Sequence, residues 1–292
     1  MNIDRPSSIR EAYMRASSFL KEQGVSEAAA CTELLLQHVL GWDRTKLLLS
    51  WPESFPVERL AEWREMITRK AAGEPVQYII GEQDFYGLSY AVTPAVLIPR
   101  PETELLVEAI VRLGSLRWPG QSPLVADIGT GSGAIAITIA VQCPQWRVWA
   151  TDLSQAALEV AIKNGRRHVG ERIEFLSGDL LAPIVERQAE VDILVSNPPY
   201  IPSADMPRLQ KEVGQYEPHT ALHGGEDGMN YYRRLLSEMD QLPSRPAIAG
   251  FEVGQGQAEA VEEMLKRQGK WAYTEIIYDL AGIGRHVLAW RS

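Results

Sequence analysis

The sequence predicts an α/β fold: a doubly wound, mostly parallel sheet of seven strands, preceded by a small helical bundle and a connecting β-hairpin. From residue 124 onward, short apolar runs alternate with helical segments, as in parallel sheets covered on both faces. Residues 8–73 show only helical periodicity. Between them, residues 75–93 are rich in β-branched and aromatic residues broken by glycines.

Composition narrows the class of protein. The 292 residues are 45% hydrophobic and 23% charged, with no low-complexity tract, and are enough for two domains. The net charge of −9 argues against affinity based on phosphate neutralisation, so we expect no stable nucleic-acid binding. The N-terminus lacks the pattern of a signal peptide, and the longest apolar stretch, residues 134–141, is too short to span a bilayer. We expect a cytoplasmic monomer with no membrane contact.

The two cysteines, Cys31 and Cys143, lie in apolar, helical surroundings. This setting favours two buried free thiols over a disulfide. No metal-ligand spacing occurs, so we expect no metal site.

The helical bundle is expected over residues 1–74. Ser8-Ile-Arg-Glu11 has the pattern of a capping box and begins the first helix, which ends near Gly24. Three further helices are expected at residues 26–41, 44–50 and 57–72. Nothing in this domain resembles a catalytic site. It is either a cap on the main domain or a docking domain for a macromolecular substrate.

A hairpin linker is expected over residues 75–95, and the main α/β domain over residues 96–292. The linker should contain strands at residues 78–80, 84–86 and 88–92. A helix should then begin near Pro101, which suits a first turn, and run to about residue 113.

The main α/β domain alternates strand and helix. The expected strands span residues 124–128, 147–151, 172–176, 191–196, 246–253, 273–278 and 285–290. The expected helices between them span residues 134–141, 154–164 and 257–268. The last two strands are too close together for a crossover helix, so they should pair antiparallel.

Three of the strand ends predict a nucleoside site. Ligands of such sheets bind at the carboxyl ends of the strands. The first strand ends at Asp127 and continues into Gly129-Thr-Gly-Ser-Gly133, whose glycines let the backbone approach a ligand closely. Asp152, at the end of the second strand, can accept both hydroxyls of a ribose, although capping of the next helix is the alternative. Asp179, after the third strand, lies where an adenine amino group would be.

The fourth strand ends in Asn197-Pro-Pro-Tyr200. Proline has a fixed φ and no N–H, so this corner stops the strand and leaves carbonyls without ladder partners. Asn197 and a backbone carbonyl can accept the two hydrogens of a planar –NH2 group, and Tyr200 offers a face for stacking. The alternative is a polar turn that closes a core strand.

In this order, Asp127-Ile-Gly-Thr-Gly-Ser-Gly133, Asp152, Asp179 and Asn197-Pro-Pro-Tyr200 resemble the Rossmann-like class I S-adenosylmethionine-dependent methyltransferases. Five further motifs narrow the resemblance to the HemK/PrmC family over nearly the whole chain: Leu97-Ile-Pro-Arg-Pro-Glu-Thr-Glu104, Glu217-Pro-His-Thr-Ala-Leu222, Gly224-Gly-Glu-Asp-Gly228, Tyr232-Arg233 and Phe251-Glu-Val-Gly254. Members of this family are protein-(glutamine-N5) methyltransferases that modify the Gly-Gly-Gln motif of peptide chain release factors.

The resemblance implies S-adenosylmethionine as cofactor, S-adenosylhomocysteine as its product and release factors as partners. It places the cofactor against Gly129, Thr130, Gly131, Ser132 and Gly133, with Asp152 on the ribose, Asp179 and Leu180 beside the adenine, and Asn197 near the methyl group. It places the substrate glutamine on Asn197, Pro198, Pro199 and Tyr200, of which Asn197, Pro198 and Tyr200 are the expected catalytic residues. Leu180 replaces an aromatic residue of some members, which should change adenine packing only slightly.

The expected chemistry depends on positioning. A carboxamide nitrogen is a poor nucleophile because its lone pair is delocalised into the carbonyl. Asn197 Oδ1 and the Pro198 carbonyl should accept its two hydrogens and orient it for in-line attack. No separate general base is required.

The residues alone are also compatible with three other functions. A DNA adenine-N6 methyltransferase also holds a planar –NH2 group in such a corner, but it would have to flip the base, and the negative charge opposes it. A glutamine of a ribosomal protein is a closer alternative target. A nucleoside-binding regulatory protein would have no need of the Asn197 corner.

A long connection and a basic cluster are the last two features that the sequence singles out. Residues 201–232 form a connection that is too long for an ordinary loop, which indicates a lid or a substrate-shaping insertion. Its residue His219 is expected to serve a turn or packing role rather than acid–base chemistry. The cluster Arg166-Arg167-His168 is interpreted as a solvated helix end.

Overall fold

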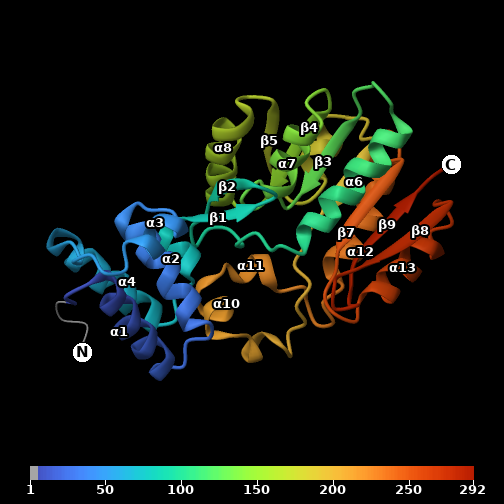
Figure 1. Cartoon of the computed structure of the whole chain (residues 1–292). Coiled ribbons are helices and arrows are strands. Elements are labelled where there is room, and N and C mark those ends of the chain that lie inside the picture. The colour runs from blue at the N-terminus through green and yellow to red at the C-terminus, as the bar shows by residue number, and fades with distance from the viewer. Residues whose placement is uncertain (1–5) are drawn as a thin grey trace. The chain divides into compact units, whose positions relative to one another are not determined.

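The computed structural model describes residues 6–292 and divides the chain into two units (Figure 1). The first unit runs to Gly81 and also includes Gln210–Tyr216, and the second comprises Glu82–Leu209 and Glu217–Ser292. Residues 1–5, on which the expectation of no signal peptide partly rests, lie outside the described residues. Among the described residues, none of the helices is both long and apolar enough to span a bilayer.

The first unit is helical, as the periodicity predicts. Its elements are α1 (Ile9–Glu22), α2 (Ala28–Leu40), α3 (Arg44–Leu49), the 3-10 turn η1 (Val57–Arg59), α4 (Leu60–Ala71), α5 (Val76–Ile80) and α10 (Lys211–Tyr216). Ser8 caps α1, because its side chain accepts a bond from the Glu11 amide at 3.2 Å. The bundle core contains Leu35, Trp63 and Ile67, each fully buried.

The strand expected at residues 78–80 is wrong, since Val76–Ile80 forms the short helix α5. Val76 and Ile79, three positions apart, bury their side chains in the core of the bundle. Gly81 then ends the helix in the left-handed conformation, with φ of +85°. Burial on one helical face here overrides the β propensity of the sequence.

The middle of the long 201–232 connection belongs to the helical unit. Lys70 of α4 is completely buried, and its Nζ lies 2.6 Å from Glu212 Oε1 of α10 and 3.1 Å from the Glu74 carbonyl oxygen. Tyr216 donates a further bond to the Ala72 carbonyl at 3.3 Å. This attachment of the connection to the bundle was not predicted.

The second unit contains the expected seven-stranded sheet. In spatial order its strands are β5 (Ile173–Ser177), β4 (Arg147–Asp152), β3 (Leu124–Ile128), β6 (Ile193–Ser196), β7 (Ile248–Glu252), β9 (Gly284–Trp290) and β8 (Tyr273–Tyr278) (Figure 1). The first five in this order pair in parallel, whereas β9 pairs antiparallel with both β7 and β8, as expected. A separate antiparallel hairpin is formed by β1 (Glu82–Phe85) and β2 (Leu88–Ala91).

Helices cover both faces of this sheet. They are α6 (Thr103–Arg117), α7 (Ala134–Gln142), α8 (Gln155–Val169), α9 (Ala182–Glu186), α12 (Asn230–Glu238) and α13 (Ala258–Arg267). The connection after β6 adds the 3-10 turn η2 (Met206–Arg208) and the short helix α11 (His219–Leu222), and the 3-10 turn η3 (Met239–Gln241) follows α12. Helices α6 and α8 continue beyond the predicted ends at residues 113 and 164, and Pro101 lies before α6 rather than in its first turn.

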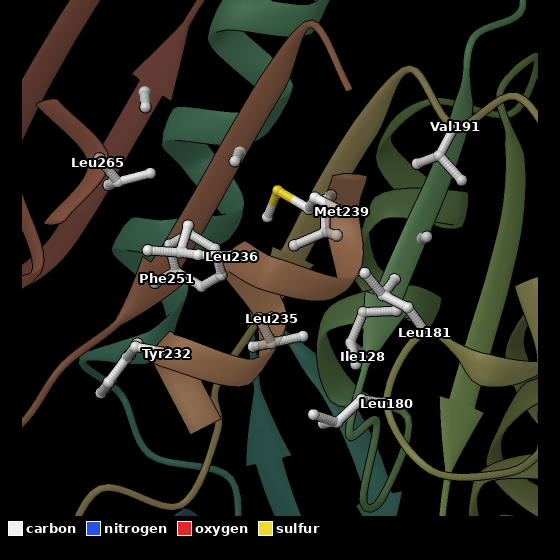
Figure 2. Close-up of a cluster of buried hydrophobic side chains, with 14 of the residues drawn as sticks. Ile128, Leu180, Leu181, Val191, Tyr232, Leu235, Leu236, Met239, Phe251 and Leu265 are labelled. Carbon is white, nitrogen blue, oxygen red and sulfur yellow. The ribbon is translucent and has the colours of Figure 1, made fainter. Parts of the chain in front are cut away.

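The sheet has a hydrophobic core on each face, because alternate residues of a strand point to opposite faces. On one face, alternate residues of β3 such as Ala126 and Ile128 pack with α12 and α13, and Figure 2 shows Leu235 and Leu236 of α12 over Ile128 and Phe251 of the sheet. On the other face, Val125 packs with α6 and α7. The free cysteines are both buried, as expected: Cys31 lies in the bundle core and Cys143 in this second face.

The Arg166-Arg167-His168 cluster is a solvated helix end, as predicted, since Arg166 and Arg167 are both exposed. It lies in the last turn of α8, and Arg166 is exposed. The other two residues contact the hairpin: Arg167 forms an ion pair with Glu82 at 2.5 Å, and His168 Nε2 lies 2.7 Å from the Ser89 carbonyl oxygen. Arg167 and His168 therefore also contact the hairpin, through one exposed ion pair and one hydrogen bond.

Candidate active site

The carboxyl ends of four parallel strands meet at one edge of the sheet. Ile128 of β3 stands opposite Thr151 of β4 on one side and Ser196 of β6 on the other. The chain proceeds outward from β3 to β5 and then returns to β6, so β3 and β6 flank the topological switch point. Because ligands of such sheets bind outside this point, the loops after β3 and β6 define the candidate site.

The glycine loop follows β3. Gly129, Gly131 and Gly133 have φ values of +74°, +56° and +84°, which favour glycine over residues with a Cβ. The amides of Gly129 and Thr130 both donate to the Thr151 carbonyl at 2.9 Å, which holds the loop against β4. Gly129 and Gly131 line a cavity of about 370 Å³, whereas the predicted cofactor residues Thr130, Ser132 and Gly133 do not line it.

Asp152 closes β4 and also lines the cavity. Its Oδ2 accepts the Gly131 amide at 2.9 Å and its Oδ1 accepts the Ser154 amide at 2.8 Å. Burial raises the pKa of this carboxyl, while the bonds from backbone amides act in the opposite direction. The helix cap of α8 is Ser154, whose Oγ accepts the Ala157 amide at 3.2 Å, so capping does not account for Asp152.

Asp179 and Leu180, after β5, complete this side of the cavity. Asp179 is partly exposed and forms an ion pair with Arg234 at 2.8 Å. Leu180 has a φ of +47°, which is uncommon for a residue with a side chain. Its carbonyl accepts a bond from the Thr151 hydroxyl at 3.1 Å, which helps to hold this conformation.

The Asn197-Pro-Pro-Tyr200 corner follows β6 on the other side of the switch point. Asn197 and Pro199 line the same cavity as Asp152 and Leu180, but Pro198 and Tyr200 do not. Pro218, Thr220 and Ala221 of the long connection and Tyr231 of α12 also line the cavity. Burial and the charge of Glu252 raise the pKa of the Tyr200 phenol above its ordinary value.

The backbone of the corner is held closely. The Tyr200 carbonyl accepts a bond from Gln257 Nε2 at 2.9 Å. The next residue pairs with the connection: the Ile201 amide donates to the Leu222 carbonyl at 2.9 Å, and its carbonyl accepts the Gly224 amide at 2.8 Å. A Cβ at Gly224 would lie 2.7 Å from Tyr200 Cα, which only glycine avoids without a shift of the backbone.

Three titratable or polar groups near the site were given no role from the sequence, although Asp127 was recognised there as the end of the first strand. Asp127 lies in β3 directly before the glycine loop, and Thr103 and Glu252 lie behind Asn197. Asp127 is fully buried, its Oδ2 accepts bonds from the Thr130 hydroxyl and the Ala136 amide, and its Oδ1 has no hydrogen-bond partner among the described residues. Burial raises the pKa of Asp127 to about 7. Thr103 and Glu252 lie in motifs that carry the family resemblance, but no local pattern joins them to Asn197.

Charged residues of the long connection are mostly paired with neighbouring segments. Glu217, whose side chain is almost completely buried, forms an ion pair with Arg100. The His219 ring lies 5.1 Å from the ring of His223, and His223 Nε2 lies 2.8 Å from Ser203 Oγ. These contacts fit the packing role expected for His219.

The sheet and its strand-end site define the fold of the class I methyltransferases. Solved methyltransferase structures share it: the delta-N METTL16 methyltransferase domain aligns with a TM-score of 0.53 and 20% identity, over 70% of this chain and 89% of that chain. The human METTL16 catalytic domain in complex with MAT2A 3'UTR hairpin 6 aligns with a TM-score of 0.55 and 17% identity, over 81% and 82% of the chains. At this identity the likeness concerns the fold alone.

Sequence comparisons identify the family. Residues 11–81 match the PrmC N-terminal domain, and residues 101–212 match the methyltransferase small domain. The release factor glutamine methyltransferase of Bacillus anthracis is 41% identical over 96% of this chain and 98% of its own. That of Bacillus subtilis is 39% identical over 96% and 97%, and that of Geobacter sulfurreducens 41% over 89% of each chain. The chain belongs to the release factor glutamine methyltransferase family.

Proposed function

We propose that this protein transfers a methyl group from S-adenosylmethionine to the side-chain amide nitrogen, N5, of the glutamine in the Gly-Gly-Gln motif of peptide chain release factors. Two facts support this proposal most strongly: the chain belongs to the release factor glutamine methyltransferase family, and Asn197 lines the cavity at the strand ends. Asn197 lies at the switch point and lines the same cavity as Gly129, Gly131 and Asp152. A hydrogen-bond acceptor for an –NH2 group thus adjoins a pocket that suits a nucleoside.

The cavity fits S-adenosylmethionine. Its volume of about 370 Å³ lies in the range of small-molecule sites. Asp152 uses one lone pair on each carboxylate oxygen for backbone amides, which leaves acceptor positions for the ribose hydroxyls. Asp179 and Leu180 would flank the adenine, and the glycine loop would approach the remainder of the cofactor. When bound, S-adenosylmethionine supplies the methyl group as an electrophile.

The residues of the corner orient the nucleophile. Asn197 Oδ1 and the Pro198 carbonyl would accept the two amide hydrogens of the substrate glutamine, which fixes its nitrogen and stabilises the positive charge that develops there. Tyr200 would form an aromatic wall beside this group. The methylated amide then loses its extra proton without a dedicated base.

The helical unit is the part we assign to docking of the release factor. We infer three parts, a docking domain at residues 1–74, a hairpin linker at 75–95 and a catalytic domain at 96–292. Large apolar side chains exposed on α1, α2 and α3 support the docking role, in particular Met14, Leu34 and Leu49, of which Leu49 is 78% exposed. We further propose that the enzyme is a cytoplasmic monomer, and its net charge of −9 fits a protein rather than a nucleic acid as substrate.

Incubation with labelled S-adenosylmethionine tests the proposal. Purified release factor, a release factor whose Gly-Gly-Gln glutamine is replaced by glutamate, ribosomal proteins and DNA are compared as substrates. The expected result is label in the unmodified release factor alone, at the glutamine side chain. Label in ribosomal protein or DNA instead of release factor would overturn it.

A further inference from the structure

Behind Asn197, a short chain of buried polar groups leads away from the cavity. Asn197 Nδ2 lies 3.5 Å from the hydroxyl oxygen of Thr103, the first residue of α6. The Thr103 hydroxyl lies 2.5 Å from Glu252 Oε2, at the end of β7. Thr103 and Glu252 are each 4% exposed, so water has little access to either group.

The single proton of the Thr103 hydroxyl decides which group donates at each step from Glu252 to Asn197. A threonine hydroxyl has a single proton, and that of Thr103 is donated to Glu252 Oε2. Thr103 therefore keeps only lone pairs for Asn197. Asn197 must then turn its Nδ2 toward Thr103, which leaves Oδ1 for the cavity. At 3.5 Å the bond between Asn197 and Thr103 is weak, so its effect is to select an orientation rather than to add much stability.

We propose that Thr103 and Glu252 are positioning residues that set the orientation of the Asn197 carboxamide. This inference rests on the proposed function, because only a substrate with an –NH2 group needs an acceptor at this place. If the carboxamide were reversed, its own –NH2 group would face the substrate –NH2 group, and two donors would meet. Neither residue needs to touch the substrate to have this effect.

Two buried residues, Tyr232 and His286, lie next to Glu252. Tyr232 donates to the Glu252 backbone carbonyl at 2.8 Å. His286, its partner across the β7–β9 ladder, is completely buried and has its Nε2 3.6 Å from Glu252 Oε2. Neither ring nitrogen of His286 has a hydrogen-bond partner among residues 6–292, so Glu252 is the polar group that this ring faces.

The test compares the full-length variants Thr103→Val and Thr103→Ser on release factor. Valine keeps the shape of threonine but removes the hydroxyl, and serine keeps the hydroxyl. Thr138→Val is a matched control, since Thr138 is also fully buried and its hydroxyl lies 2.8 Å from the hydroxyl of Tyr90. The measurements are kcat, calorimetric affinity for S-adenosylmethionine and thermal unfolding.

We expect Thr103→Val to lower kcat about tenfold, with an affinity for S-adenosylmethionine within about twofold of the wild type. Thr103→Ser and Thr138→Val should keep kcat near the wild-type value. In an Asn197→Ala background, Thr103→Val should cost less than about twofold, because it acts through Asn197.

Two results would overturn the inference: a wild-type kcat in Thr103→Val, or the same tenfold loss again in the Asn197→Ala background. If Thr103→Val does not fold, Thr103→Ala is put through the same comparisons and is held to the same results. A wild-type protein that binds S-adenosylmethionine but methylates no release factor would refute the proposed function, and this inference with it. That outcome differs visibly from the failure of a single variant.

Discussion

Asp152 illustrates at the residue scale how the structure separates two roles that the sequence leaves open. Its carboxylate bridges the amides of Gly131 and Ser154, and so joins the glycine loop to the start of α8. The side chain that caps α8 belongs to Ser154. A partly buried carboxylate at the rim of the cavity is therefore available for the ribose.

Asp152→Ala should weaken binding of S-adenosylmethionine by about tenfold or more, since it removes hydrogen bonds to a charged group. Isothermal titration calorimetry measures this loss. The matched control is Asp43→Ala, which removes the aspartate cap of α3 in the helical unit and should leave the affinity unchanged. Equal affinities of wild type and Asp152→Ala would exclude the ribose role.

Asp127 predicts a pH dependence of stability. Burial raises its pKa from 3.8 to about 7, so between these values the folded protein holds a proton that the unfolded chain has released. Its contribution to the free energy of unfolding is complete below about pH 4 and is lost as the pH rises toward about 7. In Asp127→Asn the side chain at this position does not ionise, so this variant should not lose free energy of unfolding in this pH range. Calorimetric unfolding without ligand should therefore show the wild type falling relative to Asp127→Asn as the pH rises, and parallel profiles would contradict the raised pKa.

At the scale of elements, the Asn197 corner depends on the connection that packs against it. A Cβ at Gly224 would meet Tyr200 Cα at 2.7 Å and the Pro199 carbonyl oxygen at 2.8 Å, and both are backbone atoms that cannot simply rotate away. The position of the nucleophile is thus set partly by residues remote in sequence.

Gly224→Ala should shift the corner and lower kcat by about tenfold or more, because small displacements at a reacting centre are costly. Gly165→Ala is the control, since its added Cβ meets only the flexible ring of Phe175, at 3.0 Å. Steady-state kinetics on release factor compares them. A wild-type kcat in Gly224→Ala would show that the corner tolerates the displacement.

Helices and strands whose hydrophobic residues follow a regular period were predictable from the sequence. All seven strands of the sheet and the order of their polar ends follow from short apolar runs that end in Asp152, Asp179 and Asn197. The strand expected at residues 78–80 was wrong because tertiary burial of Val76 and Ile79 decided a segment with mixed propensity. The link from Asn197 to Thr103 and Glu252 joins residues 94 and 149 positions apart in its two steps, which no local pattern encodes.

Considering the whole molecule, the long connection at residues 201–232 contributes residues to both units. Its α10 belongs to the helical unit through the Lys70–Glu212 ion pair, whereas Pro218, Thr220 and Ala221 line the cavity of the catalytic unit. Removing Glu212 would leave the completely buried Lys70 ammonium without its carboxylate.

Glu212→Ala should lower the local free energy of unfolding of α4 and α10 by about 2 kcal/mol, less than for a fully buried pair because the Glu212 side chain is 31% exposed. Hydrogen exchange resolved to these helices measures it. The double variant Lys70→Met/Glu212→Leu should recover most of the loss. Glu62→Ala, from an exposed pair in the same unit, should change stability by less than about 0.5 kcal/mol. No difference between the two alanine variants would show that the buried pair is not important for α10.

A single-turnover reaction of wild type and Asn197→Ala with release factor tests whether Asn197 positions the glutamine amide for methylation. The product is analysed by fragment mass spectrometry, and the affinity for S-adenosylmethionine is measured by calorimetry. We predict a methyl group on the side-chain nitrogen of the Gly-Gly-Gln glutamine for the wild type. For Asn197→Ala we predict a rate lower by more than about tenfold, with a smaller change in cofactor affinity. Equal losses of rate and affinity, or a methyl group on another residue, would contradict the account.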